Sequence, residues 1–452
     1  NWDLKLGIVR ILAKIRENSE KRGKFGVYAL TGSFVMDRLL EVFLRRIVKL
    51  GTFTIRTASG HTFSLGDGTG KALTIIFTDR AAQARLIRDP ALTLGELYMD
   101  GQLLIEGGDV LDLHMAAQRN ISAADISGVL RLADRMRFMI RGLKQNNHPL
   151  RSTSNVAHHY DLDGRLYSLF LDKDMQYSCA YFEHPDVSLE EAQLAKKRHI
   201  AAKLAVEPGH SVLDIGCGWG GMALYLADVC QARVTGVTLS NEQLRVANKR
   251  AFQQGPGTQV HFRIQDYREI EETFDRVVSV GMLEHVGAGY LDAYFAKVAA
   301  VLKADGAALV HTIGRTDGPG VTNPWIDKYI FPGGYIPAMS EVTAAIERAG
   351  LMIADIEILR MHYADTLREW RKRFLARRDD IKELYDERFC RMWDFYLAGS
   401  EASFRLGQNV VFQFLLARQV DSLPVTRDYI GLREEELRHR EPDLLRYRMA
   451  GE

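Results

Sequence analysis

A glycine-rich segment in the middle of the chain has the residue types of a ligand-binding turn. Val212–Gly221 reads VLDIGCGWGG and leads from an apolar run into a predicted helix near Met222. Gly216, Gly218 and Gly220 let the backbone approach a ligand closely, and a helix N-terminus offers unpaired N–H donors. Nucleotide and dinucleotide sites use similar turns, and a tight turn without a ligand has the same residues.

The charge beside this turn narrows the class of ligand. Asp214 lies two residues before Gly216. Its carboxylate would repel a pyrophosphate, but it would attract a sulfonium cation and the ammonium group of an amino acid. The sequence therefore favours S-adenosylmethionine as the cofactor.

Two more segments are candidates for binding the rest of the cofactor. In Val237–Gln243, Thr238 stands where many nucleoside sites carry an acid, and Gln243 is a neutral residue able to hydrogen-bond both ribose hydroxyls. Gln265–Arg268 follows the next predicted strand and would cover the adenine. Each segment is equally compatible with a loop that binds no ligand.

The strands that would position these segments alternate with helical stretches. Strand-like runs are found at Ser211–Ile215, Ala232–Val237, Gln259–Ile264, Arg276–Val280 and Ala307–Ile313. This alternation predicts an α/β domain, a parallel sheet wrapped by helices. Asn409–Arg418 is apolar and β-compatible, and we expect it to form an antiparallel edge of the sheet.

The N-terminal part of the chain predicts a smaller α+β domain. An amphipathic helix over Phe34–Leu50 would end at Gly51, a residue suited to the left-handed stop position. Strands are expected at Thr52–Thr57, His61–Leu65 and Ala72–Phe77, followed by two short helices that end at about Gln118.

A break in the pattern sets the domain boundaries. Residues 121–151 are helical at first and then polar, and Asn146, Asn147, His148 and Pro149 interrupt the periodicity. A chain of 452 residues also exceeds what one core usually organises. We expect a smaller α+β domain over 1–125, a linker over 126–150 and an α/β domain over 151–452.

Composition excludes several classes of function. Lys and Arg number 59 against 58 Asp and Glu, so the chain lacks the global field that gathers nucleic acid. The four cysteines are scattered without a close pair, so neither a metal site nor a disulfide framework is expected, and a reducing cytoplasm fits. No apolar run approaches the roughly 20 residues that cross a bilayer.

Several of these segments together resemble one family, the cyclopropane-fatty-acyl-phospholipid synthases. They are YSCAYF (Tyr177–Phe182), LDIGCGWGG, VTLSNEQ, EHVG (Glu284–Gly287), VHTIG (Val310–Gly314), YIFPGGYIP (Tyr329–Pro337) and HYADTL (His362–Leu367). The resemblance covers the whole second domain, 151–452, and implies that this is the catalytic domain. It extends more loosely to the first domain, 1–125, which is similar to the N-terminal lipid-associating domain of the longer, bacterial members. It implies a Rossmann-like seven-stranded methyltransferase fold, the chemistry of ring formation on a lipid double bond, and a homodimer.

The resemblance also implies roles for individual residues. Tyr177 and Ser178 would close over the methionine part of S-adenosylmethionine. The rest of the cofactor would be lined by Gly216, Gly218, Thr238, Leu239, Gln243, Asp266 and Tyr267. A bicarbonate ion would be held by Cys179, Glu284, His311, Ile313 and Tyr363. Taken singly, each His or Cys is more simply a satisfied core residue.

Ring formation places demands on such a site. An alkene is a weak nucleophile, so the methyl donor must be held in contact with it. Methyl transfer leaves a carbocation that water would trap as an alcohol, so a closing segment such as Tyr329–Pro337 must exclude water. Aromatic faces stabilise a nearby cation, unless the rings simply fill the core. The candidates are Tyr177, Phe182, Tyr329, Phe331, Tyr335 and Tyr363.

The last step removes a proton from the added methyl group. Bicarbonate suits this role: Glu284 would accept its O–H, while His311, Tyr363 and backbone N–H groups near Ile313 would donate to its oxygens. Cys179 would pack at its edge. Direct proton abstraction by Glu284 is the competing mechanism, because a buried carboxylate of raised pKa is an able base.

Three other functions share parts of this sequence pattern, and the proposed substrate implies contact with a membrane. A lipid methyltransferase with a branched or hydroxylated product, a methyltransferase for a small amine or sterol, and a non-catalytic lipid carrier share parts of the pattern. We expect a cytoplasmic enzyme bound peripherally to the inner face of the membrane. The basic amphipathic run Leu4–Ile15 and the cations Arg45, Arg46 and Lys49 would meet anionic headgroups, unless they are ordinary helix faces.

Overall fold

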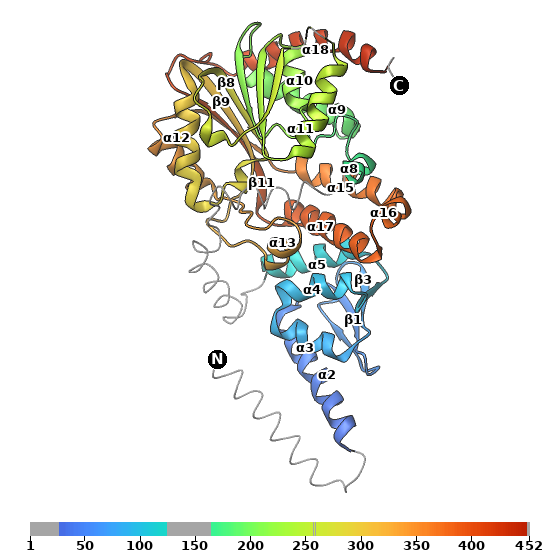
Figure 1. The fold of residues 1–452 in the computed structure, drawn as a ribbon. Coiled ribbons are helices and arrows are strands. Elements are labelled where there is room, and N and C mark those ends of the chain that lie inside the picture. Colours follow the sequence, from blue (N-terminus) through green and yellow to red (C-terminus); the bar gives the residue numbers. More distant parts are fainter. Residues whose placement is uncertain (1–26, 124–163, 256, 258, 450–452) are drawn as a thin grey trace. The chain divides into compact units, whose positions relative to one another are not determined.

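The predicted ligand segments lie on a sheet of seven strands in the order β10-β11-β9-β8-β5-β6-β7 (Figure 1). The computed structural model describes residues 27–123, 164–255, 257 and 259–449. The strands are β5 (Ser211–Ile215), β6 (Arg233–Thr238), β7 (Val260–Ile264), β8 (Phe274–Val280), β9 (Leu302–Arg315), β10 (Met352–Leu359) and β11 (Asn409–Ala417). Neighbours from β9 to β7 are parallel, while β11 is antiparallel to both β9 and β10. The predicted α/β fold is confirmed.

The prediction for Asn409–Arg418 was half wrong. The segment is antiparallel as expected, but it lies inside the sheet, and β10 forms the edge. Seven consecutive residues of β11 are buried, whereas β10 is mostly half-buried or exposed. The continuous apolar run is typical of a strand covered on both faces, and the edge position is taken by β10, which was not among the predicted strands.

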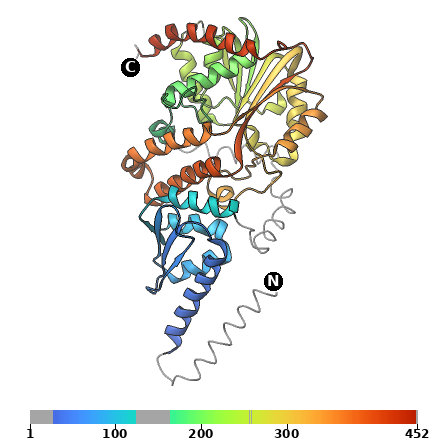
Figure 2. The same cartoon turned by 180° about the vertical axis from the view of Figure 1, so that it is seen from behind.

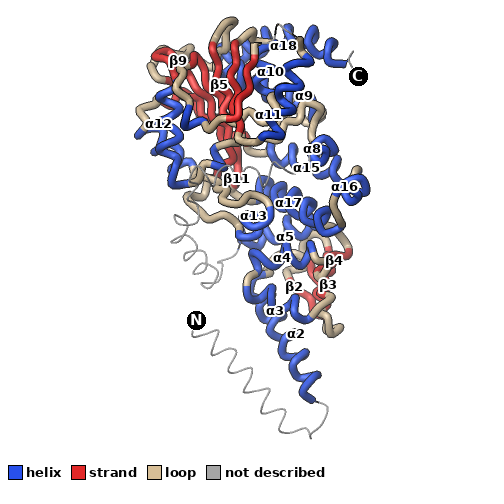
Figure 3. The backbone as a smooth tube through the Cα atoms, viewed as in Figure 1, coloured by secondary structure: helices blue, strands red, loops and turns tan. Residues whose placement is uncertain are grey.

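Helices cover both faces of this sheet (Figures 1 and 3). The described helices of this unit are α8 (Gly164–Phe170), α9 (Leu189–Lys203), α10 (Gly221–Asp228), α11 (Asn241–Gln253), α12 (Leu291–Val301), α13 (Pro324–Tyr329), α14 (Met339–Arg348), α15 (His362–Ala376), α16 (Arg378–Leu384), α17 (Glu387–Leu406) and α18 (Asp428–Met449), with short 3-10 turns η1 (Tyr267–Glu269), η2 (Leu283–His285) and η3 (Ala288–Tyr290).

Each face of the sheet has its own apolar core. On one face α12 and α14 pack on the strands through side chains such as Phe295 and Ile346. On the other face α9, α10 and α18 pack through Ile200, Leu224 and Leu437. Figure 2 shows this second group of helices from behind, in green and red. The sheet is therefore fixed from both sides, and the loops at its carboxyl edge have a rigid base.

The N-terminal unit has an α+β fold of its own. Its sheet has the order β2-β1-β3-β4, with β1 (Thr52–Arg56), β2 (Thr62–Leu65), β3 (Ala72–Phe77) and β4 (Leu103–Glu106), and its helices are α2 (Val27–Ile47), α3 (Arg80–Arg88), α4 (Pro90–Met99) and α5 (Val110–Ala123). The three predicted strands are confirmed. The four-residue strand β4 and a third helix after β3 were missed, because so short a strand carries little pattern. The helix α2 ends at Ile47, so Gly51 does not stop it; with φ of 103° it opens β1 instead.

Clustering of contacts separates two compact units, residues 1–139 and 140–452. The predicted linker and the amphipathic run Leu4–Ile15 lie outside the described residues, so both stay predictions. Within the described part of the chain, no helix has the length and apolar character needed to cross a bilayer.

Candidate functional site

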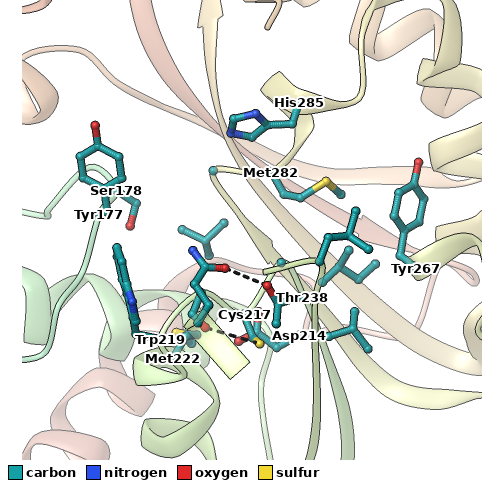
Figure 4. Close-up of a pocket in the computed structure, with 18 of the residues that line it drawn as sticks. Tyr177, Ser178, Asp214, Cys217, Trp219, Met222, Thr238, Tyr267, Met282 and His285 are labelled. Atoms are coloured by element: carbon teal, nitrogen blue, oxygen red, sulfur yellow. Dashed lines mark hydrogen bonds between the residues drawn. The ribbon is translucent and has the colours of Figure 1, made fainter. Parts of the chain in front are cut away.

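The predicted cofactor segments surround one pocket at the carboxyl edge of the parallel strands. Tyr177, Ser178 and Thr238 all line it. Figure 4 shows Tyr177 and Ser178 on one side, Tyr267 on the other, and Asp214 between them. Of the eleven residues that the sequence suggested for the cofactor, ten line the pocket: Tyr177, Ser178, Asp214, Gly216, Gly218, Thr238, Leu239, Gln243, Asp266 and Tyr267.

The glycines of the turn have different tasks. Gly216, Gly218 and Gly220 all have positive φ, which L side chains rarely adopt. A Cβ on Gly218 would meet nothing within 4 Å, so this residue borders open space in the pocket. A Cβ on Gly220 would lie 2.6 Å from Cζ of Phe262, so Gly220 serves packing behind the turn and caps α10 rather than lining the pocket.

Asp214 is a buried carboxyl group with an unused oxygen. Among the described residues its Oδ2 has no hydrogen-bond partner. Burial raises the pKa of Asp214 to about 7, and the charge of Lys196 opposes this shift. A buried anion without a partner is costly, so a cationic ligand beside it would be stabilised. This orphaned oxygen fits the ammonium or sulfonium group of S-adenosylmethionine.

The residues expected for the nucleoside are held by local hydrogen bonds. Thr238 donates from Oγ1 to Oε1 of Gln243 at 2.8 Å, a bond drawn in Figure 4. This bond fixes the amide so that its NH₂ group remains available to a ligand. Asp266 accepts two bonds from the guanidinium of Arg268, at 2.9 and 2.5 Å, and caps the 3-10 turn that carries Tyr267.

A buried lysine and a buried tyrosine hold the segment that carries Tyr177 and Ser178. Lys196 on α9 is fully buried and donates to Oε1 of Gln176 at 2.7 Å and to Oγ of Ser178 at 2.8 Å. The hydroxyls of Tyr177 and Tyr396 lie 3.0 Å apart. This segment is therefore held by contacts with two helices, α9 and α17.

Sequence reasoning missed several residues of the pocket wall. Among them are Met175, Gln176, Trp219, Met282, His285 and Tyr290. Burial lowers the pKa of His285 to about 4, so the ring is neutral near pH 7. Two signals were available: His285 follows Glu284 directly in the loop after β8, and Trp219 stands inside the glycine-rich segment Val212–Gly221.

Three residues expected for the bicarbonate ion, Glu284, His311 and Ile313, lie near the point where the β8–β9 pairing ends, and two of them are in contact. Gly281 donates its N–H to the carbonyl of His311 at 2.8 Å, and two residues further along β9 the N–H of Ile313 donates to Oε1 of Glu284 at 2.5 Å. The Glu284 carboxylate thus accepts from the N–H of Ile313, as a backbone carbonyl of the neighbouring strand would if the β8–β9 pairing continued. The N–H of Ile313, expected as a donor to the ion, is already used by Glu284.

Glu284 also has an orphaned oxygen. Its Oε2 has no hydrogen-bond partner within the described ranges. Burial raises the pKa of Glu284 to about 7, and the bond from Ile313 opposes this shift. The free Oε2 fits the acceptor of an O–H group such as that of bicarbonate.

Of the two other residues expected for the ion, Tyr363 lies on α15 and Cys179 lies on a segment that is bonded to α15. Cys179 is buried, and burial raises the pKa of its thiol, which therefore stays protonated. The neighbouring amide of Ala180 donates to Oγ1 of Thr366 at 3.0 Å, which joins this segment to α15. Tyr363, one turn before Thr366, packs its ring on Phe404 with centroids 4.8 Å apart.

The six aromatic candidates have separate environments. Tyr177 lines the pocket. Phe331 packs edge-on against Tyr396, and Tyr363 packs edge-on against Trp370, so both contact rings that also hold Tyr177. The other three rings have contacts elsewhere: Phe182 with His362, Tyr329 with Trp325, and Tyr335 through its hydroxyl with Glu341.

Comparison with known proteins adds independent findings. A sequence model of the family described as mycolic acid cyclopropane synthetase matches residues 147–414. Another model, described as a domain of unknown function, matches residues 39–123. The cyclopropane-fatty-acyl-phospholipid synthase of Escherichia coli (strain K12) is 39% identical over 340 residues, which cover 75% of this chain and 86% of that protein.

A second relative and a solved structure extend the comparison. A Pseudomonas putida protein named a probable fatty acid methyltransferase is 34% identical over 388 residues, covering 82% of this chain and 93% of that protein. The crystal structure of the mycolic acid cyclopropane synthase CmaA1 complexed with SAH and CTAB has 32% sequence identity and a TM-score of 0.56, covering 59% of this chain and 98% of that chain.

Proposed function

Because the chain belongs to the mycolic acid cyclopropane synthetase family, we propose that it methylates the cis double bond of acyl chains in membrane phospholipids and closes a cyclopropane ring. It is an S-adenosylmethionine-dependent methyltransferase of the cyclopropane synthase type. The proposal rests most on Glu284, a buried carboxyl group with a free oxygen. In the sequence, Glu284 stands between Met282 and His285, and both of these neighbours line the cofactor pocket.

The chain's own residues hold and orient the cofactor. When bound, S-adenosylmethionine supplies an electrophilic methyl group on sulfur. Asp214 offers its free oxygen to a cationic group of this ligand, and Gln243 offers its amide to the ribose. Tyr177 and Ser178 close the other side of the pocket (Figure 4). These contacts would place the methyl group in contact with the alkene, which supplies much of the rate enhancement.

The next requirement is a dry site in which a carbocation survives. Rings of Tyr177, Trp370 and Tyr396 pack together beside the pocket. Their faces stabilise positive charge, and their bulk excludes water. The backbone of the predicted closing segment also reaches the site, because the N–H of Tyr335 donates to the carbonyl of Glu284 at 2.9 Å.

Proton removal then needs a base near the new methyl group. We propose bicarbonate, which supplies that base when bound. Glu284 would accept its O–H at the free Oε2, and His311 and Tyr363 would donate to its oxygens. Glu284 itself is the alternative base, since its pKa of about 7 suits proton transfer near neutral pH. Activity that is unchanged in a carbonate-stripped preparation, with no effect of added bicarbonate, would assign the step to Glu284.

A second candidate function is methylation of a lipid without ring closure, because one relative is named a probable fatty acid methyltransferase. Product mass separates the two outcomes. The enzyme would be incubated with labelled S-adenosylmethionine and vesicles of unsaturated phospholipid. A gain of one CH₂ supports cyclopropanation, a gain of CH₄ supports reductive methylation, and a gain of CH₂ plus water supports hydration. Absence of any lipid product overturns the proposal.

The cellular setting is proposed with the function. An acyl double bond lies below the headgroups, so the enzyme would work in the cytoplasm, bound peripherally to the inner face of the membrane. A homodimer would place two binding surfaces on one membrane and raise avidity. Flotation with vesicles and light scattering test these two points.

A further inference from the structure

A row of polar side chains crosses the sheet at β10, β11 and β9. Glu357, Gln413 and His311 are directly opposite one another on these three strands, so their side chains share one face. Lys203, the last residue of α9, reaches this row, where it contacts Glu357 and donates to Oε1 of Gln413 at 2.9 Å. Nε2 of Gln413 lies 3.2 Å from Nδ1 of His311.

The members next to His311 are shielded from water. His311, Gln413 and Lys203 are each at most 2% exposed. A buried donor that faces another donor costs about 1–3 kcal/mol, so each hydrogen bond in this row has a definite direction.

These directions fix the proton on His311. An ammonium group only donates, so the Gln413 atom that meets Lys203 is the amide oxygen. The other end of the amide is an NH₂ group, which also only donates, and it faces Nδ1 of His311. Nδ1 must therefore carry a lone pair. The remaining proton of a neutral imidazole is then on Nε2.

The surrounding charges agree with a neutral ring. Burial, followed by the charges of Lys196, Lys203 and His199, holds the pKa of His311 well below its usual value, against a smaller opposing effect of Glu357. Both ring nitrogens of His199 face carboxylates, at 2.7 Å to Glu357 and 2.6 Å to Glu434. The two histidines therefore have opposite roles: His199 completes a surface-linked ion network, while His311 is kept uncharged.

We propose that Lys203 and Gln413 are positioning residues that hold His311 as its neutral Nε2–H tautomer, so that this N–H donates to the anion of the deprotonation step. The role of the anion rests on the proposed function. In this form His311 is a fixed donor and not the base, because Nε2 has no lone pair to accept a proton.

Nitrogen NMR of the full-length protein labelled at histidine tests the tautomer without substrate. The signals of His311 are identified by their loss in His311→Gln. In the unsubstituted protein, Nε2 should be protonated and Nδ1 unprotonated around neutral pH. A spectrum with the proton on Nδ1, or with both nitrogens protonated, overturns the proposal.

Substitution of Gln413 tests the mechanism of control. Gln413→Glu has nearly the same shape, but its carboxylate accepts from both Lys203 and the ring. We expect the His311 proton to move to Nδ1 or the ring to become charged, and kcat to fall by about tenfold or more while the affinity for S-adenosylmethionine is kept. Gln413→Met removes the donor without adding charge, so His311 should become a mixture of tautomers. This variant is the test of the positioning role if Gln413→Glu does not fold.

A matched control makes the same change elsewhere. Gln408 lies at the exposed start of the β11 segment, where its Oε1 accepts from Thr316. Gln408→Glu should leave both the histidine spectrum and kcat unchanged. If both Gln413 variants fold and keep the original His311 spectrum, the positioning role is wrong. If the tautomer is as stated but no cyclopropane lipid forms, the proposed function fails while the tautomer assignment stands.

Discussion

At the scale of residues, two buried carboxyl groups dominate the electrostatics of the site. Asp214 and Glu284 each have one oxygen without a partner among the described residues, and burial raises both pKa values to about 7. A folded protein gains stability by removing such groups. Their presence in one pocket wall and the adjoining loop is therefore best explained by ligands that the two carboxylates bind.

We predict that the affinity for S-adenosylmethionine depends on pH through Asp214. A bound cation lowers the pKa of the carboxyl group, so binding near pH 7 releases a proton. Below about pH 7 the affinity should fall, approaching tenfold per pH unit. Calorimetry in two buffers of different ionisation enthalpy measures the released proton. Asp214→Asn should bind more weakly above pH 7 and lose most of the pH dependence; an unchanged slope would contradict this.

We predict that Glu284→Gln separates activity from stability. The loss of the acceptor should lower kcat by about 10²-fold or more, with little change in cofactor affinity. The folded-state pKa of about 7 exceeds the ordinary value of 4.5, so the contribution of Glu284 to stability is present below pH 4.5 and is lost as the pH rises through 7. The variant should therefore be more stable at pH 8, by up to about 3 kcal/mol. Urea unfolding at pH 5 and pH 8 checks the sign, and equal stability at both would refute it.

At the scale of elements, the turn between β5 and α10 combines packing with ligand access. Gly220 touches Phe262 behind the turn, while Gly218 borders open space in the pocket. The two glycines share the need for positive φ but differ in what lies beside them. They are therefore a matched pair for separating the fold from the ligand site.

We predict different outcomes for alanine at these two positions. Gly220→Ala adds a contact of 2.6 Å to Phe262 as well as backbone strain, so it should cost about 2–4 kcal/mol of folding free energy. Gly218→Ala should cost about 1–2 kcal/mol, from strain alone. Its methyl group would, however, narrow the pocket and weaken cofactor binding. Denaturant unfolding and calorimetry check both quantities; a larger stability loss at Gly218 would be inconsistent with the geometry.

At the scale of the whole molecule, the proposed function requires contact with a lipid surface. Arg45, Arg46 and Lys49 are exposed near the end of α2. Arg45 forms an ion pair with Glu41 at 2.9 Å, and Lys49 donates to the carbonyl of Arg45 at 2.6 Å. Part of this positive charge is therefore offset within the helix, and Arg46 is the better probe of the predicted contact.

We predict that Arg46→Glu weakens binding to vesicles that contain anionic phospholipid. Each cation near such a surface contributes about 1 kcal/mol, so charge reversal should reduce binding by roughly tenfold or more at low salt. The difference should shrink as salt screens the charges. Lys372→Glu, at a side chain 77% exposed on α15, controls for net charge. Equal losses in the two variants, or a loss that salt does not affect, would speak against a local contact.

The parts of the fold that the sequence predicted are those with a local cause. Glycines between an apolar run and a helix predicted the β5 turn, and the alternation of elements predicted the parallel sheet. The strand β4 is too short to carry a pattern, and the inner position of β11 depends on β10, a strand not recognised beforehand. Met282 lines the pocket through tertiary contact and belongs to none of the motifs recognised in the sequence.

For this protein the sequence by itself determined the family, the cofactor turn and the types of side chain available for the chemistry, since these are encoded in contiguous motifs. Only the tertiary structure decided that the N–H of Ile313 binds Glu284 and that Lys203 acts on His311 through Gln413. The reason is physical: burial and hydrogen-bond direction arise when distant strands and helices pack together, and these two quantities set the charge and the proton position of each group.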